Sequence, residues 1–155
     1  MKMKTLQHAF SVLALASATL FIQSCGKEDA QPSVEQRIAK TWIMNDMTAT
    51  ISGQTESVYA DNVDPCMQDD EYTFTANGAI SVFGSSSKCD PDEPNPVSTG
   101  TFTILDGGKK ISINADGTGS ETFDLDELTA TSLKVSQVDN SLGIPIKITL
   151  IYRAK

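Results

Sequence analysis

Histidine is nearly missing from this chain of 155 residues, since His8 is the only one. Without an imidazole, residues 9–155 cannot form a Ser-His-Asp or Cys-His catalytic site, and they cannot bind zinc or haem through histidine. Basic residues are also scarce, with 12 Lys and Arg against 20 Asp and Glu. Because phosphate binding needs clustered positive charge, this composition argues against a nucleic-acid partner.

Long apolar runs are missing too, apart from one near the N-terminus. Residues 9–22 carry no charge, follow Lys2 and Lys4, and precede the small residue Ser24. This run has 14 residues, whereas a membrane-spanning helix needs about 20. The pattern predicts an export signal, and we expect residues 1–24 to be removed. An ordinary secretion signal followed by a chance cysteine is the alternative.

Cysteine is rare as well, and the position of Cys25 is informative. It follows Ser24 at the end of the apolar run, as in the lipobox of a bacterial lipoprotein, although Ile22 and Gln23 stand where Leu and a small residue are usual. We therefore predict that Cys25 is acylated and that residues 25–33 form a tether to the membrane. Residues 26–29, Gly-Lys-Glu-Asp, resemble the signal of surface-exposed lipoproteins of the Bacteroidetes. The prediction is an outer-membrane lipoprotein of the cell envelope; a merely solvated tether is equally compatible with these charges.

The other two cysteines, Cys66 and Cys89, remain as a pair in a chain that we expect to be exported. An oxidising compartment favours a disulfide between them. Their spacing lacks the Cys-x-x-Cys pattern of a redox site, and two thiolates without histidine make a poor metal site. Residues 25–155 carry 10 basic and 20 acidic residues, a net charge of −10 that favours solubility. Their number, 131, suits a single domain.

The pattern of residues 34–155 predicts one short helix followed by strands. Ser33 and Gln36 fit a capping box, so a helix should cover residues 34–40. Asn77-Gly78 predicts a hairpin with a type I′ turn, and Pro145 belongs at the start of a strand because it lacks an amide donor. Alternating apolar and polar residues predict strands at 42–51, 71–76, 79–83, 99–105, 109–114, 121–126, 131–138 and 143–153.

About eight short strands joined by tight turns favour an all-β fold, an antiparallel up-and-down meander. Closing the meander into a barrel removes its exposed edges. An eight-stranded barrel is either filled by its own side chains or just able to hold a small ligand.

The order of these motifs resembles the lipocalin-like domain lipoproteins of the Bacteroidetes. The likeness covers residues 34–155: the lipobox and short helix, Trp42 at the first strand, Cys66, the run Asp69 to Phe74, Cys89, and Gly100-Thr101-Phe102 before the later hairpins. It implies a lipocalin-like barrel without enzymatic activity or cofactor. It also implies that Trp42 closes one barrel end and that Arg153 packs over it, with Lys40 where lipocalins have Gly.

By analogy with lipocalins, we expect a small apolar ligand inside the barrel of a monomer. The expected lining residues are Met44, Tyr72, Phe74, Phe102, Ile111, Phe123, Leu133 and Ile148. The alternative is a protein-interaction module, on the surface or in the periplasm, with a filled barrel. The acidic residues at 69–71 and 90–93 allow a third hypothesis, a carboxylate hydrolase or calcium site, but exposed loop acids need no such role, and we predict no metal site.

Overall fold

The computed structural model describes residues 31–115 and 119–155. The predicted signal peptide, Cys25 and most of the predicted tether lie outside these described residues. None of the helices in the described ranges is long and apolar enough to cross a bilayer.

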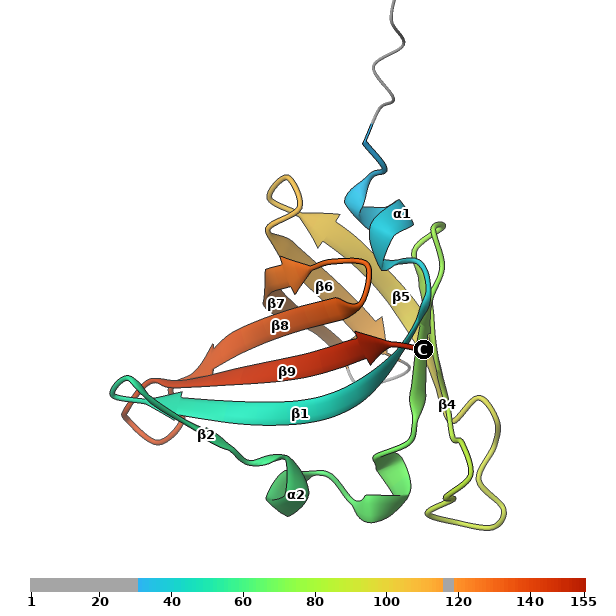
Figure 1. Ribbon diagram of the computed structural model, residues 1–155, viewed down its shortest axis with the longest axis horizontal. Helices are drawn as coiled ribbons and strands as arrows, with labels where there is room; N and C mark the ends of the chain where they lie inside the picture. Colours follow the sequence, from blue (N-terminus) through green and yellow to red (C-terminus); the bar gives the residue numbers. More distant parts are fainter. Residues whose placement is uncertain (1–30, 116–118) are drawn as a thin grey trace, which may run out of the picture. The chain divides into compact units, whose positions relative to one another are not determined.

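Nine strands and three short helical segments make up the described chain (Figure 1). The helical segments are α1 (Val34–Ile38), α2 (Tyr59–Asn62) and the 3-10 turn η1 (Pro65–Met67). The strands are β1 (Thr41–Ile51), β2 (Gln54–Ser57), β3 (Glu71–Phe74), β4 (Ala79–Phe83), β5 (Ser98–Leu105), β6 (Lys110–Ala115), β7 (Gly119–Leu128), β8 (Ser132–Asp139) and β9 (Ile146–Ala154).

The strands form one closed antiparallel barrel, which confirms the predicted fold class. Each strand from β3 to β8 pairs with the next, and β1 pairs with both β3 and β9, so that eight strands close on themselves. The ninth strand, β2, pairs with the last four residues of β1, whereas β3 pairs with the first three residues of β1. Strand β1 therefore belongs both to the barrel wall and to the β1–β2 hairpin, which extends beyond the barrel.

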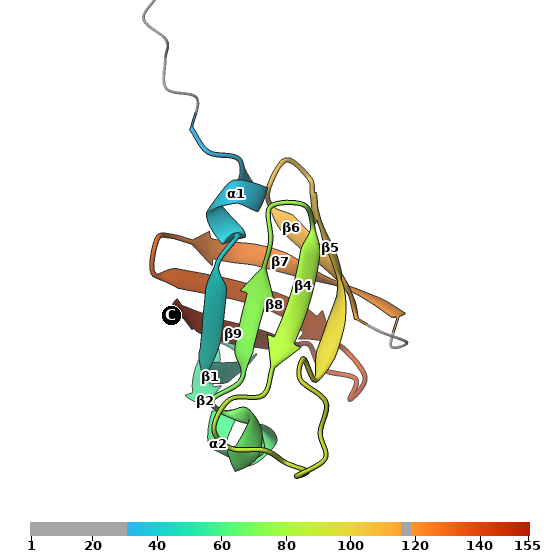
Figure 2. The ribbon, with the colours of Figure 1, turned by 90° about the vertical axis from the view of Figure 1, so that its right-hand side faces the viewer.

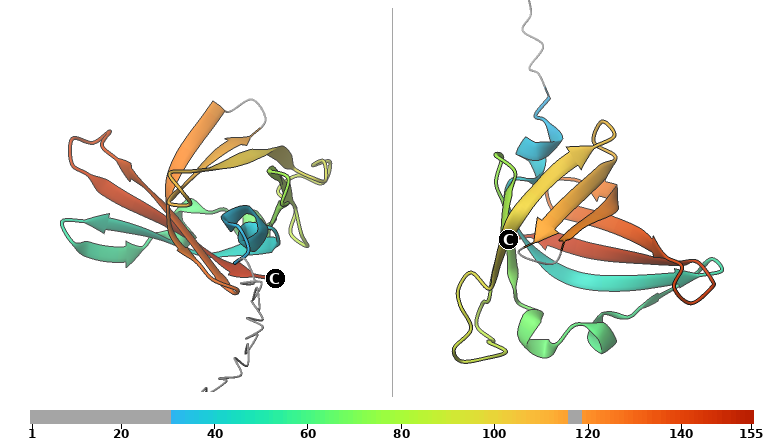
Figure 3. Two further views of the ribbon diagram at one scale, coloured as in Figure 1. Left: turned by 90° about the horizontal axis from the view of Figure 1, so that it is seen from above. Right: turned by 180° about the vertical axis from the view of Figure 1, so that it is seen from behind.

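The short helix α1 covers one end of the barrel, and we call this the closed end (Figures 1 and 2). Its capping box forms as predicted: the Ser33 hydroxyl accepts from the Gln36 amide at 3.3 Å, and the Gln36 side chain accepts from the Ser33 amide at 3.0 Å. The helix ends at Ile38, two residues earlier than expected. Seen from above, α1 lies within the ring of strands (Figure 3), and Ile38 is fully buried.

The core follows the alternation of inward and outward residues on each strand. Its buried apolar side chains come from α1 and from the eight barrel strands: Ile38, Trp42, Met44, Phe74, Ile80, Phe102, Ile111, Phe123, Leu133, Val135 and Tyr152. A register shift between Met44 and Asp46 keeps Met47, rather than Asp46, opposite the inward Leu150 of β9. The barrel thus has one continuous apolar interior.

Two local predictions are wrong. Residues 52–70, where no helix or strand was predicted, contain β2, α2 and η1. The β1–β2 turn has positive φ at both Ser52 (51°) and Gly53 (81°), the geometry of a type I′ turn.

The Asn77-Gly78 hairpin forms, but only Gly78 (87°) has positive φ there. Its type is therefore not I′, and the amide of Thr75 bonds the carbonyl of Ala79 around a longer turn.

Candidate ligand cavity

A cavity of about 360 Å³ occupies the barrel interior. Most of its wall is apolar, contributed by inward side chains of six neighbouring strands from β3 to β8 and by β9. The lining residues are Tyr72, Phe74, Ile80, Val82, Ser98, Thr99, Ile111, Ile113, Ala115, Gly119, Glu121, Phe123, Leu133, Val135, Leu150 and Tyr152.

Strand register explains why these side chains meet. In the β6–β7 pair, Ile111 faces Phe123 and Ile113 faces Glu121. In the β8–β9 pair, Leu133 faces Tyr152 and Val135 faces Leu150. Because successive side chains alternate across a strand, residues two apart share the interior face. The cavity wall is therefore built from i, i+2 pairs on adjacent strands.

The wall changes character along the barrel axis. Toward α1 it is made by buried residues, such as Ile111 and Leu133, which are 0% and 1% exposed. At the other end Thr99, Gly119 and Glu121 line the cavity while being exposed to solvent. We call this the open end. The cavity thus has a dry apolar floor and a partly polar mouth.

Two tyrosine rings form the middle of the wall. Tyr72 and Tyr152 pack edge to face with their ring centroids 5.3 Å apart. Burial raises the pKa of Tyr72 to about 12, and it also raises the pKa of Tyr152. Both phenols are therefore neutral at physiological pH. Tyr59 on α2 lies nearby, and its hydroxyl donates to the carbonyl of Met44 at 3.2 Å.

Five of the eight residues predicted to line the interior do so: Tyr72, Phe74, Ile111, Phe123 and Leu133. The other three are Met44, Phe102 and Ile148. Met44 and Phe102 are buried in the core outside the cavity wall, and the Phe102 ring packs against Phe74 at 5.1 Å. Ile148 pairs with Ala49 and Gln137, nearer the end of the long β1–β9 ladder.

Sequence reasoning missed several apolar lining residues: Ile80, Val82, Ile113, Val135, Leu150 and Tyr152. All of them lie on the predicted inward faces of predicted strands, so alternation was a sufficient signal. It also missed Glu121, which shares the inward face of β7 with Phe123. An acidic residue gave no reason to expect an interior position.

The predicted packing of Arg153 over Trp42 is wrong. Arg153 is exposed, because alternation on β9 points Tyr152 inward and its neighbour outward. Trp42 is fully buried at the closed end, and its indole N–H donates to the carbonyl of Ile38 at 2.9 Å. The cation over the indole is Lys40, whose Nζ lies 5.2 Å from the ring centroid and also donates to the carbonyl of Ala130. Lys40 therefore takes the role expected of Arg153.

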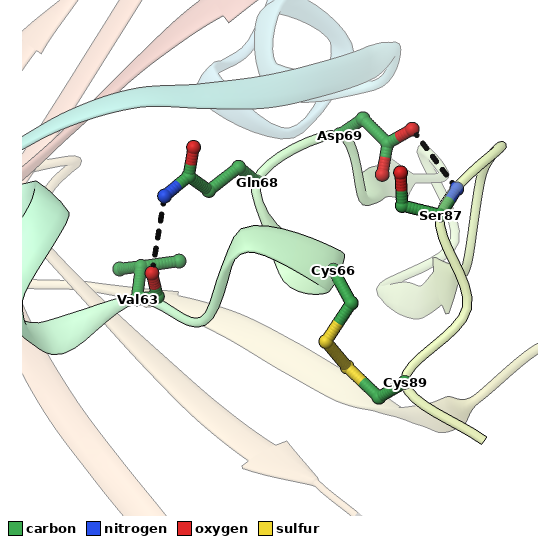
Figure 4. The surroundings of a disulfide bond; sticks show 6 residues. All are labelled: Val63, Cys66, Gln68, Asp69, Ser87 and Cys89. Atoms are coloured by element: carbon green, nitrogen blue, oxygen red, sulfur yellow. Dashed lines mark hydrogen bonds between the residues drawn. A yellow bond between two sulfur atoms is a disulfide. The ribbon is translucent and has the colours of Figure 1, made fainter.

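The disulfide Cys66–Cys89 forms as predicted (Figure 4). It joins η1, which precedes β3, to the loop that follows β4. The disulfide therefore links the two segments at the end of the β3–β4 hairpin that lies opposite its turn. Asp69 makes a second connection between the same segments. Its carboxylate accepts hydrogen bonds from the Ser86 amide at 3.0 Å, the Ser86 hydroxyl at 2.5 Å and the Ser87 amide at 3.3 Å.

The acidic residues near this disulfide do not form a metal site. In residues 31–115 and 119–155, no group of three or more acidic, Cys or His side chains is arranged to hold a metal ion. Asp69 instead bonds the backbone and side chains of the loop, and Asp70 is buried at 6% exposure. The calcium hypothesis therefore gains no support from the geometry.

Two solved structures are similar to this chain. A lipocalin-like protein from Bacteroides uniformis is 17% identical, with a TM-score of 0.48, over 77% of this chain and 99% of its own. Bovine odorant-binding protein, solved with a selenium-containing odorant, is 18% identical, with a TM-score of 0.43, over 83% of this chain and 76% of its own. Among curated proteins, no sequence matches this chain significantly. The sequence model of the lipocalin-like domain matches residues 38–135, well over half of the chain. This protein therefore belongs to the lipocalin-like domain family.

Proposed function

We propose that this protein is an exported lipoprotein, anchored through Cys25, whose barrel binds a small apolar ligand without catalysing a reaction. The cavity of about 360 Å³ is the observation that carries the binding function. It falls within the size range of small-molecule sites, roughly 300–1,000 Å³. A module that acts only through its loops would have no need of this space, so the cavity favours ligand binding over the alternative of a filled barrel.

The chemistry of the wall supports binding rather than catalysis. Phe74, Ile111, Phe123 and Leu133 offer apolar contacts over the inner part of the cavity. Only one carboxylate, Glu121, lines the cavity in the described part of the chain. A glycosidase of the usual kind needs two carboxylates that flank the substrate. The cavity wall therefore suits a ligand that is held and released unchanged.

Cell-envelope attachment rests on the cysteines and on the N-terminal pattern. Cys66 and Cys89 form a disulfide with each other, so Cys25 is the one cysteine of the three outside this disulfide. Metabolic labelling with palmitate should mark the wild-type protein and leave Cys25→Ser unlabelled. Equal labelling of both would contradict the anchor. Added protease should cleave the protein on intact cells if it is surface-exposed, and only after lysis if it faces the periplasm.

A cavity-blocking variant tests ligand binding. Val82 on β4 lines the cavity, while Ser81 beside it points to the outer face. The cavity could hold roughly twelve groups of the size of a water molecule, at about 30 Å³ each, so 1-decanol is a suitable probe. We expect native mass spectrometry to detect one decanol on the wild-type protein.

The matched variants separate the interior from the surface. Val82→Trp should weaken decanol binding at least about tenfold, which corresponds to roughly 1.4 kcal/mol. Ser81→Trp adds the same side chain to the outer face and should bind like the wild type. Equal binding by both variants would place decanol outside the barrel, and no binding by the wild type would overturn the proposed function.

A further inference from the structure

The described residues give the cavity a single charge, which is negative. Of the residues that line it in the described ranges, Glu121 is the only one with a carboxyl group, and none is a lysine or arginine. The other lining residues with polar side chains are Ser98, Thr99, Tyr72 and Tyr152, and all of them carry hydroxyls. A ligand inside the barrel therefore meets one carboxylate and no cation from the described lining residues.

The location of Glu121 marks it as a group that faces the ligand. It lies on the inward side of β7, opposite Ile113 in the register and two residues before Phe123. Two residues of a strand span about 7 Å, so its carboxylate stands at the mouth while Phe123 forms the inner wall. Phe123 is buried and Glu121 is exposed. A ligand with its tail on Phe123 would place its head group beside Glu121.

The other acids of β7 are engaged in ion pairs. Asp124 pairs with Lys110 at 2.5 Å, Asp126 with Lys147 at 3.0 Å, and Glu127 with Lys134 at 2.9 Å. Those three contacts lie away from the cavity lining. Glu121 forms no ion pair or hydrogen bond with the described residues. Its charge is therefore available to a ligand.

The tyrosines cannot replace a cation. Their raised pKa values keep Tyr72 and Tyr152 neutral, so they can form hydrogen bonds but cannot neutralise a carboxylate. The head group of a ligand would lie at the exposed mouth, where the charge of Glu121 repels a carboxylate. A fatty-acid anion is thus a poor match for this wall, whereas a protonated amine or a neutral alcohol avoids the repulsion.

We propose that the cavity selects amphiphiles by the charge of their head group, and that Glu121 is the residue that favours a protonated alkylamine and disfavours a carboxylate. This inference rests on the proposed function, because it requires a ligand in the barrel. The tail would lie among Phe74, Ile111 and Phe123, and the ammonium would lie at the mouth.

Three probes with the same tail test the proposal: decylamine, 1-decanol and decanoate. At pH 7 the amine is protonated and the acid is ionised. Their affinities should be measured on the full chain carrying Cys25→Ser, so that no acyl group of the protein itself competes for the cavity. An exposed ion pair changes affinity by up to roughly fivefold. The free energies of attraction and repulsion add, so their affinity factors multiply. With about threefold from each, decylamine should bind about tenfold more tightly than decanoate.

Substitution of Glu121 identifies the source of the selectivity. Glu121→Gln should bring the amine-to-acid ratio close to one while leaving decanol affinity nearly unchanged. Glu56→Gln removes the same charge from β2, where Glu56 is exposed and away from the cavity, and it should keep the wild-type ratio. Decanol binding without amine preference, or a preference that survives Glu121→Gln, would overturn the inference but not the proposed function. Failure of all three probes to bind would overturn both.

Discussion

The two ends of the barrel are held together by different kinds of interaction. At the closed end, α1 places Ile38 against Trp42, and both side chains are fully buried. At the open end, the strands leave a mouth lined by Thr99 and Glu121, and the nearby loops are joined by a disulfide and by Asp69. Apolar packing thus stabilises one end, whereas covalent and polar links order the loops at the other.

This difference separates stability from recognition. Buried apolar contacts contribute most to the free energy of folding, so the closed end should determine whether the barrel forms. The open end contains the lining residues that reach solvent, so it should determine what enters. A change at one end is therefore expected to leave the property of the other largely intact.

The closed end should show the largest stability effect. Trp42→Ala removes a fully buried side chain and should lower the free energy of unfolding by about 3–5 kcal/mol. Chemical denaturation at equilibrium would measure the loss. Trp42→Phe keeps much of the apolar volume but loses the hydrogen bond to the carbonyl of Ile38, so its loss should be smaller. An unchanged unfolding midpoint in Trp42→Ala would contradict the assigned role of this end.

The disulfide should have a somewhat smaller effect. Cys66 and Cys89 are 23 residues apart, and a loop of this size corresponds to about 3 kcal/mol in the chain-entropy estimate. The double variant Cys66→Ala, Cys89→Ala should therefore unfold at a lower denaturant concentration than the oxidised wild type. Reduced wild type is the matched control and should behave like the double variant.

Ligand binding gives a further test of what the Cys66–Cys89 disulfide does. Neither cysteine lines the cavity, so decanol affinity at a temperature where the barrel is folded should change by less than about threefold, or roughly 0.6 kcal/mol. A much larger loss of affinity would mean that the disulfide shapes the cavity itself. The separation between loop order and recognition would then be wrong.

Most of the barrel was predictable from the sequence because strands with one buried face alternate. The eight barrel strands follow this rule, and Pro145 directly precedes β9 as expected. Strand β2 was missed because its four residues are all exposed, so no apolar period marks them. It forms because Ser52 and Gly53 adopt the turn that folds the chain back onto β1.

The cavity was only partly predictable, since alternation gives the face of a residue but not its height in the barrel. Phe102 and Ile148 lie on inward faces yet fall outside the cavity, because the stagger between strands sets their height. Glu121 was missed for the opposite reason: its face was predictable, but its charge argued against an interior position.

The smallest expected effect comes from two neighbouring carboxyl groups in the open-end loops. Burial, with the nearby charges of Asp69 and Glu93, raises the pKa of Asp70 above its ordinary value of 3.8. Hydrogen bonds from Ser86 lower the pKa of Asp69 below the same value. The charged form of Asp70 is thus disfavoured by folding, and that of Asp69 is favoured.

The two pKa shifts predict opposite responses to substitution and to pH. At pH 7, Asp70→Asn should raise the melting temperature slightly, because it removes an unfavourable charge. This gain should vanish as the pH falls through the raised pKa towards 3.8, since folded Asp70 is then protonated anyway. Asp69→Asn should lower the melting temperature at pH 7, and its loss should disappear only below 3.8, as the folded carboxyl takes up its proton. Melting curves of both variants between pH 3 and 7 would test this, with Asp61→Asn, an exposed acid on α2, as the control. Parallel pH profiles for the two variants would mean that the open-end loops do not distinguish these carboxyls, whereas opposite profiles would show that polar links order this end of the barrel.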